Sequence, residues 1–394
     1  MKILFVTYDI PYPLDTGGKI RAYHLIKQLS RGHQITLFSY YRKKSQLDYL
    51  PELKKYCQKI CSFQRMPVFS FKHLTTTLLH PSLTAHIAHY YHPEIKIHLR
   101  EEIGRGNYDL LHFESFFTSY LLNDWGLPQI LGTENIEWRV FLEHAKKQKI
   151  PLLREAMIFE SLRTRWFEEK TWRKANVCLA VSQENANEIE KVTGKKCYLI
   201  PNGIDLDYFE FNKITKQQDN KITILFVGNF KYIQNQDAAT VLAKNIFPLI
   251  KKEIKNAKLL IVGRHPTKEI KNLNSKDILV DDQIKEIKEA YWQADLLLAP
   301  IRAGSGTKFK ILEAMACSLP VITTPLGIEG IKAQDKKEVL IRESVDNLAK
   351  AAIQLINNKN LKIELIFEAR KLVEREYSWE KIGKKLEKVY QTIR

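Results

Sequence analysis

The residues that cross-link a chain or carry it through a membrane are scarce in this sequence. Five cysteines stand among 394 residues, and they form neither a CxxC pair nor a Cys/His cluster with the spacing of a zinc site. We find no run of about 18 uninterrupted apolar residues, so we expect no spanning helix. The opening MKILFVTYDIPYP has no small-residue cleavage site after its apolar run, which predicts a first strand rather than an export leader. We expect a reduced, cytoplasmic protein.

Negative charge is the scarcer sign. The chain has 45 Asp and Glu against 62 Lys and Arg, a net charge of +17. Two explanations of this excess are equally good. Lysines simply cover solvated faces, or the charge attracts an anionic membrane, a phosphate-bearing substrate or nucleic acid. No RNA- or DNA-binding signature stands out, so we expect no nucleic-acid partner; an RNA-binding protein remains an alternative on charge alone.

Residues 63–100 are rich in histidine, tyrosine and leucine and hold six of the eleven histidines. The histidine spacings do not repeat a metal pair on one helix face, so we expect no metal there. Two readings stay open: a structural helical insertion, or an amphipathic flap that meets a lipid-linked acceptor or the inner face of the membrane, to which the protein would then bind peripherally.

The order of apolar runs predicts an α/β protein with two domains. Residues 1–40 read as strand, Pro/Gly-rich loop, helix and strand, the unit of a doubly wound parallel sheet. The same pattern restarts at Lys221 after a polar stretch, 213–220. We expect an N-terminal domain over 1–200 and a C-terminal domain over 201–376, two Rossmann-like domains facing a central cleft. The last helix, 377–394, is expected to pack back on the first domain.

The strongest local signal is the stretch 301–325, IRAGSGTKFKILEAMACSLPVITTP. A glycine-rich loop between a strand and a helix presents backbone N–H groups to a phosphate, and the helix N-terminus adds partial positive charge. Lys308 and Lys310 strengthen that site, although no Walker sequence or full dinucleotide fingerprint is present. Glu313 lies in an otherwise apolar helix, where a ribose diol or a buried salt bridge is needed to satisfy it.

These residues resemble the donor-binding motif of glycosyltransferase family 4, the group 1 glycosyltransferases of the GT-B fold. The resemblance extends over nearly the whole chain, with further matching stretches at 13–38, 179–209, 225–250, 259–263 and 377–390. It implies a retaining transfer of a hexosyl group from a nucleotide-sugar donor to a glycan or lipid-linked acceptor, in cell-surface polysaccharide biosynthesis. It also implies that no metal or other cofactor takes part, so Asp205 and Asp207 are not expected to form a metal-binding pair.

The resemblance assigns roles to residues in three groups. For catalysis it implies Glu134, Lys308 and Lys310. For donor binding it implies Gly17, Gly18, Asn229, Lys231, Ser305, Gly306, Thr307 and Glu313. For acceptor binding it implies Arg21, His112 and Arg139, although Arg21 is equally suited to pairing with a carboxylate.

The sequence departs from the family pattern at three places. Ser305 replaces the first of two glutamates that the family commonly carries, and Glu134 replaces a common histidine. Asn229 and Gln234 stand where an Arg and a Lys are frequent, which leaves Lys231, Lys308 and Lys310 to offset the diphosphate charge. A non-catalytic sugar-nucleotide binder and a sugar-nucleotide epimerase on a similar fold therefore stay open as alternatives.

Overall fold

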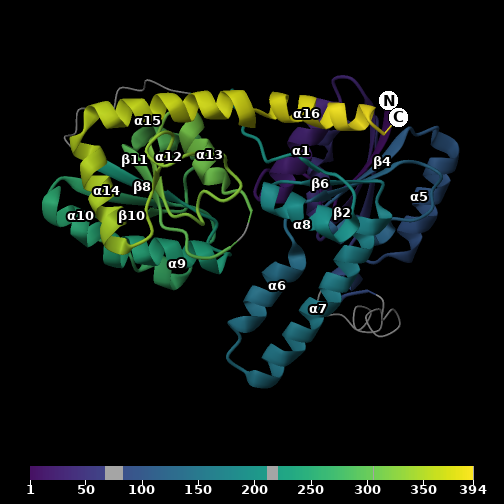
Figure 1. Ribbon diagram of the computed structural model, residues 1–394, viewed down its shortest axis with the longest axis horizontal. Helices are drawn as coiled ribbons and strands as arrows, with labels where there is room; N and C mark the ends of the chain where they lie inside the picture. Colours follow the sequence, from purple (N-terminus) through teal and green to yellow (C-terminus); the bar gives the residue numbers. More distant parts are fainter. Residues whose placement is uncertain (67–82, 211–220, 305, 394) are drawn as a thin grey trace. The chain divides into compact units, whose positions relative to one another are not determined.

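The computed structural model describes residues 1–66, 83–210, 221–304 and 306–393. These residues divide into two compact units (Figure 1). Unit 1 comprises Met1–Pro201 with Ile382–Arg394, and unit 2 comprises Asn202–Lys381. The last helix, α16 (Trp379–Gln391), thus begins in unit 2 and continues in unit 1. Each unit is an α/β domain of the Rossmann-like type, so the predicted fold class of both domains is confirmed.

Unit 1 is built on a seven-stranded parallel sheet with the order β3-β2-β1-β4-β5-β6-β7. Its strands are β1 (Lys2–Val6), β2 (Gln34–Tyr41), β3 (Lys59–Gln64), β4 (Leu110–Glu114), β5 (Gln129–Thr133), β6 (Val177–Ala180) and β7 (Cys197–Leu199). The central strand β1 is apolar on both faces from Ile3 to Val6, because helices cover the sheet on either side. The strand order reverses between β1 and β4, where doubly wound folds bind ligands beyond the carboxyl ends of the strands.

The helices of unit 1 differ widely in length. The described α-helices are α1 (Gly17–Leu29), α2 (Leu50–Leu53), α4 (Ala85–Ala88), α5 (Pro93–Gly106), α6 (Glu137–Lys146), α7 (Pro151–Lys174) and α8 (Gln183–Thr193), with 3-10 turns η1 (Lys44–Tyr49) and η2 (Phe116–Leu121). The α6 and α7 helices pair along their length into a hairpin that projects away from the sheet of unit 1 (Figure 1). The C-terminal part of α16 packs on α1, where any side chain at Gly383 would collide with Gln28.

Unit 2 repeats the architecture with a six-stranded parallel sheet in the order β10-β9-β8-β11-β12-β13. Its strands are β8 (Ile222–Val227), β9 (Ala257–Val262), β10 (Ile278–Asp281), β11 (Leu296–Ala299), β12 (Val321–Thr323) and β13 (Leu340–Ile341). The order reverses between β8 and β11. The loops after these two strands are therefore the places where this sheet is expected to hold a ligand.

Helices surround the second sheet and complete its core. They are α9 (Ile233–Val241), α10 (Phe247–Glu253), α11 (Lys268–Lys271), α12 (Ile287–Gln293), α13 (Phe309–Ala316), α14 (Val345–Asn357) and α15 (Lys359–Leu372), with π-helical turns η3 (Leu242–Ile246) and η4 (Val373–Tyr377). The helical segment from α9 to α10 is interrupted by η3, next to Pro248 at the start of α10. Proline has no backbone N–H to donate to the residue four positions earlier, so the regular α-helical hydrogen bonds are interrupted in the turn before it.

Candidate active site

The glycine-rich loop of unit 2 joins β11 to α13, as the sequence predicts. Gly304 and Gly306 have φ of +98° and +76°, a backbone conformation that favours glycine. Thr307 follows, and its buried hydroxyl has no hydrogen-bond partner among the described residues. Ser305 lies outside the described residues. The loop therefore ends in an unsatisfied hydroxyl beside the first turn of a helix, where an anion is stabilised.

Lys308 shapes this loop from its C-terminal side. Its ammonium donates to the carbonyl of Gly306 at 2.6 Å. Burial lowers its pKa to about 8, and Glu329 opposes that shift. Lys308 is thus a cation held within the loop, and an approaching phosphate would favour its charged form.

Lys310 lies one residue into α13, and its ammonium donates to Asn235 Oδ1 at 2.8 Å. Its ammonium also lies 4.5 Å from the centre of the Phe226 ring. Burial lowers the pKa of Lys310 to about 7, while Glu313 raises it and Lys308 lowers it further. A lysine in this state gains much of its charge when an anion binds.

Glu313 lies one turn further along α13 and accepts a hydrogen bond from the Tyr291 hydroxyl at 2.5 Å. Burial raises the pKa of Glu313, although Tyr291 and Lys310 both favour its charged form. The sequence predicts a ribose diol or a buried salt bridge as the partner of Glu313. In the structure Tyr291 of α12 is a hydrogen-bond partner of its carboxyl group. As a whole residue, Glu313 is partly buried.

Asn229 and Lys231 lie in the turn that follows β8. The side-chain oxygen of Asn229 accepts from the backbone N–H of Lys231 at 3.1 Å. The backbone carbonyl of Asn229 accepts from Asn235 Nδ2 at 2.9 Å. Asn235 thereby joins this turn to Lys310. A side chain at Gly263 would collide with the carbonyl of Gly228, so the loops after β8 and β9 touch backbone to backbone. The structure thus connects Asn229 to Lys310 of α13 through Asn235, whereas Lys231 is exposed to solvent.

In unit 1, the first turn of α1 meets Glu134. A side chain at Gly18 would come within 3.0 Å of both Glu134 carboxyl oxygens and within 2.1 Å of the Tyr8 hydroxyl. Gly18 therefore allows the glutamate to approach the helix backbone. The Oε1 atom of Glu134 is buried and has no hydrogen-bond partner among the described residues. Gly17 is exposed at the start of the same helix.

The surroundings of Glu134 favour its neutral form. Burial raises its pKa to about 8, and the charge of Glu114 adds to the rise while Arg21 opposes it. Glu137, three residues later, behaves alike, since burial raises its pKa to about 7. Glu134 is therefore a carboxyl group that gains or loses a proton near neutral pH, the property required of a general acid or base.

Arg21 and His112 meet at a carboxylate, Glu114, which lies at the carboxyl end of β4. Arg21 Nε donates to Glu114 Oε1 at 2.7 Å, and His112 Nε2 lies 2.7 Å from Oε2. His112 Nδ1 lies 2.5 Å from the Tyr390 hydroxyl of α16. Burial raises the pKa of Glu114, but Arg21 and His112 outweigh it and the pKa falls to about 2. A side chain at Gly132 would enter the space of Glu114.

Two of the expected acceptor residues thus lie in the interior, because Arg21 and His112 are both 0% exposed. For Arg21 the structure favours pairing with a carboxylate, and that carboxylate is buried. The structure places Arg139 elsewhere, on the first turn of α6, where its exposed guanidinium pairs with Glu188 of α8.

Sequence reasoning missed four polar residues of these sites: Tyr8, Glu114, Asn235 and Tyr291. Glu114 was the most visible of them, since a carboxylate at the end of the apolar run LLHFE stands where such sheets hold ligands. The other three contact the predicted residues from separate elements, which no local pattern indicates.

No group of three or more His, Cys, Asp or Glu side chains within the described ranges is arranged to hold a metal ion. Of the expected insertion 63–100, residues 67–82 lie outside the described part, and with them His73 and His80. His86 stacks on Phe141 of α6 with ring centres 3.6 Å apart. All five cysteines are free thiols. None of the described helices has the length and apolar character needed to cross a membrane.

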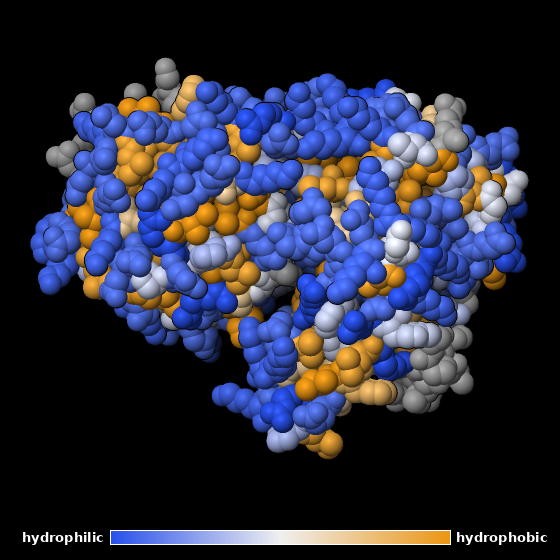
Figure 2. Space-filling model, in the orientation of Figure 1, coloured by the Kyte–Doolittle hydropathy of each residue, from blue (hydrophilic) through white to orange (hydrophobic). Residues whose placement is uncertain are grey.

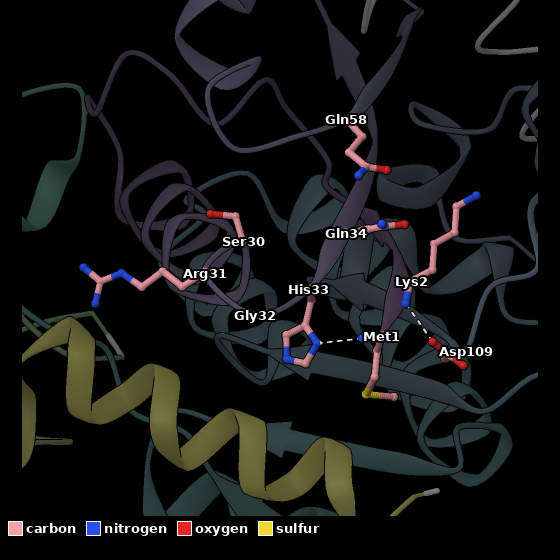
Figure 3. A pocket seen from close by; sticks show the side chains of 9 residues that line it. All are labelled: Met1, Lys2, Ser30, Arg31, Gly32, His33, Gln34, Gln58 and Asp109. Carbon is pink, nitrogen blue, oxygen red and sulfur yellow. Dashed lines mark hydrogen bonds between the residues drawn. The ribbon is translucent and has the colours of Figure 1, made fainter.

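One open hollow of unit 1 lies away from both groups of residues. It has a volume of about 640 Å³ and is lined by Met1, Lys2, Ser30, Arg31, Gly32, His33, Gln34, Gln58 and Asp109. Figure 3 shows the terminal amine of Met1 directed at His33 and the Lys2 N–H at Asp109. These residues precede β1 to β4, so the hollow lies at the amino ends of the strands, opposite the edge where such sheets bind ligands. We do not count it as the active site.

Two family models match the chain in tandem and together span most of it. The model described as "Glycosyltransferase Family 4" matches residues 16–208, and the one described as "Glycosyl transferases group 1" matches residues 221–358. Both Gly17 and Glu134 fall within the first match, and the whole glycine-rich loop with α13 falls within the second.

Related proteins agree with these matches. An uncharacterised 44.6 kDa protein in the cps region of Klebsiella pneumoniae is 22% identical over 97% of both chains. A putative teichuronic acid biosynthesis glycosyltransferase of Bacillus subtilis, TuaC, is 26% identical over 56% of this chain and 57% of its own.

Solved structures share the fold across the full length. Sucrose-phosphate synthase from Thermosynechococcus elongatus superposes with a TM-score of 0.73 at 17% identity, covering 100% of this chain and 98% of its own. HepE of Anabaena, in complex with UDP and glucose, superposes with a TM-score of 0.66 at 15% identity and covers 100% of both chains.

Proposed function

The chain belongs to the group 1 glycosyltransferases with a family 4 N-terminal domain, and from this premise we propose that it transfers a hexosyl group from a nucleoside-diphosphate sugar to a glycan or lipid-linked acceptor, with retention at the anomeric carbon. The observation that carries the donor assignment is the α13 loop. There the Thr307 hydroxyl, Lys308 and Lys310 gather at the carboxyl end of β11. HepE, which binds UDP and glucose, supports a nucleotide of this kind.

Each donor-side residue has a distinct part in this proposal. The loop N–H groups, Thr307 and the two lysines bind the diphosphate and stabilise the charge that it gains as it leaves. Glu313 accepts from the ribose hydroxyls, with Tyr291 holding its carboxyl group in place. Asn229 and Lys231 complete the donor site from the turn after β8. No metal is assigned, because cationic side chains and the helix N-terminus supply the positive charge.

The chemical step exchanges one bond at the anomeric carbon for another. The bond to the diphosphate oxygen breaks, the acceptor oxygen bonds on the same face, and the acceptor proton leaves with the diphosphate. Gly17, Gly18 and Glu134 are the unit 1 residues assigned to this step, with Glu134 contacting the sugar through its unpartnered oxygen. Arg139 is assigned to the acceptor, while Arg21 and His112 position Glu114 from the interior.

We assign the reaction to cell-surface polysaccharide biosynthesis in the cytoplasm. Support comes from TuaC, whose name places it in teichuronic acid biosynthesis, and from the Klebsiella relative in the cps region.

A thermal-stability screen with a panel of nucleoside-diphosphate sugars tests the donor assignment. A donor at 100 times its dissociation constant adds about 2.7 kcal/mol to the free energy of unfolding. We expect at least one donor to raise the melting temperature of the wild type, and Glu313→Gln to reduce that shift. If no nucleotide or nucleotide sugar stabilises the protein, the proposal fails. Binding without turnover in the presence of acceptor extracts favours the non-catalytic alternative.

A further inference from the structure

The hairpin of α6 and α7 exposes large apolar side chains to solvent. Leu152 is 83% exposed, Phe159 64% and Trp166 57%. These three residues are seven apart, so they share one face of α7 and form a stripe. Ile150, Leu153 and Leu162 are also exposed. Figure 2 shows apolar atoms gathered over this hairpin.

The inward face of α7 has the opposite character. Four of its six buried residues are Ser161, Thr164, Glu168 and Thr171, while Phe167 and Trp172 are the buried aromatics. An ordinary surface helix buries its apolar stripe and exposes its polar one. Here the sequence sets Leu, Phe and Trp outward although the inner contacts are largely polar. A contiguous exposed apolar surface of this kind marks an interaction site.

The polar contacts of the inner face fix the hairpin in place. The Glu168 carboxyl group accepts from the backbone N–H groups of Glu137 and Trp138 at the start of α6, each at 3.0 Å. Burial raises its pKa well above the ordinary value, although these two hydrogen bonds oppose the shift. The Ser161 hydroxyl donates to the Trp138 carbonyl at 2.7 Å. The apolar stripe is therefore presented on a braced element.

The hairpin tip, which we define as residues 146–154, adds a concentrated positive charge. Its sequence KKQKIPLLR has four basic residues, Lys146, Lys147, Lys149 and Arg154, and no acidic one. All four are exposed, and they flank the exposed Ile150, Leu152 and Leu153 in the sequence. At the two edges of the tip, Lys146 pairs with Glu143 and Arg154 with Glu155, so Lys147 and Lys149 carry most of the excess charge. Higher along the stripe the ammonium of Lys170 lies 4.9 Å from the centre of the Trp166 ring.

We propose that this hairpin docks the protein on an anionic membrane surface. Apolar residues of the tip and stripe enter the interface between headgroups and acyl chains, and the lysines and Arg154 contact the lipid phosphates. Tryptophan at such a boundary has its indole ring at headgroup level. The assignment is independent of donor binding, because the hairpin contains none of the residues of the α13 loop.

A second copy of the chain is the other candidate for covering the stripe, and charge disfavours it. Parallel pairing of two hairpins brings two basic tips together. Antiparallel pairing sets each tip against Lys170, Arg173 and Lys174 near the other end of α7. Both arrangements oppose like charges, which costs affinity, whereas anionic lipid complements them.

The test is co-sedimentation with phosphatidylcholine vesicles, with and without phosphatidylglycerol. We expect the wild type to bind only the anionic vesicles, and to bind much less as the Debye length falls from about 10 Å at 0.1 M salt to about 3 Å at 1 M. Lys146→Glu, Lys147→Glu and Lys149→Glu combined should lower binding at low salt by about tenfold or more. Leu152→Ser with Phe159→Ser should lower it through lost apolar contact, and both positions are exposed enough for the fold to survive.

A matched control separates the tip from the overall charge. Lys268→Glu, Lys276→Glu and Lys350→Glu change the net charge equally at exposed positions of unit 2, and this variant should keep most of its binding. The proposal is overturned if the wild type ignores anionic vesicles at low salt, or if the tip variant binds as well as the control. A dimer in light scattering that Leu152→Ser with Phe159→Ser converts to monomer also overturns it, in favour of a second copy.

Discussion

Two glutamates of unit 1 show how neighbouring charges decide the state of a buried carboxyl group. Glu114 is 1% exposed, yet its pKa falls to about 2 because Arg21 and His112 contact it directly. Glu134 has no such partner, and burial raises its pKa to about 8. At neutral pH the Glu114 carboxyl group is therefore charged and fixed in place, whereas that of Glu134 is ready to exchange a proton.

This difference predicts how the stability of unit 1 depends on pH. In the unfolded chain Glu134 ionises near 4.5, whereas in the folded chain it stays neutral up to about 8. Its burial therefore costs nothing below pH 4.5 and an increasing amount as pH rises from 4.5 to 8. Glu134→Gln should raise the melting temperature at pH 8 and leave it nearly unchanged at pH 4.5. An equal shift at both pH values would show that Glu134 does not titrate in this way.

Lys310 supports a second prediction, for ligand binding. Since its pKa is about 7 in the free protein, binding of a nucleoside diphosphate must be accompanied by proton uptake above that pH. We expect the affinity measured by calorimetry to fall between about pH 7 and 9, where free Lys310 loses its proton. Lys310→Arg keeps its charge throughout and should flatten this decline. Lys268→Arg, far along the sequence on α11, is the matched control and should retain the wild-type slope.

At the scale of elements, the hairpin depends on one side chain for the start of α6. Ile136 precedes that helix and offers no capping oxygen, and Glu168 of α7 caps it instead by accepting from two backbone N–H groups. Glu168→Ala should lower the free energy of unfolding in urea by about 1 to 2 kcal/mol. Glu169→Ala, which removes a carboxylate paired with two arginines that are about half exposed, should change it by less than about 1 kcal/mol. Equal effects would contradict the capping role.

The elements also show what the sequence does and does not reveal. The long apolar runs at 3–7, 222–228 and 257–263 coincide with the interior strands β1, β8 and β9, since a strand covered on both faces must be apolar throughout. The edge strands β3, β7, β10 and β13 escape prediction. They are short or half-buried, as in KICSFQ, where no residue of the strand is fully buried. Their pairing depends on the neighbouring strand more than on their own pattern.

The candidate site follows the same division. The α13 loop, Lys310 and Glu313 lie within ten residues of one another in the sequence, so a local pattern reveals them. The Arg21, His112 and Glu114 cluster joins a helix to a strand 93 residues away, and no local pattern predicts which charges meet. The outward apolar face of α7 is also hidden in the sequence, because its buried positions are largely polar and give the opposite impression of which face is inside.

For the whole molecule, the proposed function is one reaction: donor turnover with retention and without a metal. The most direct test follows a stabilising nucleotide sugar by proton NMR in the presence of EDTA. Transfer of the sugar to an acceptor from the extract, or to water in its place, should release the nucleoside diphosphate. The sugar product that forms first should have the anomeric configuration of the donor. Lys308→Ala should slow this release, since leaving-group charge is then less stabilised. An inverted product, or turnover that EDTA abolishes and a divalent ion restores, would contradict the account.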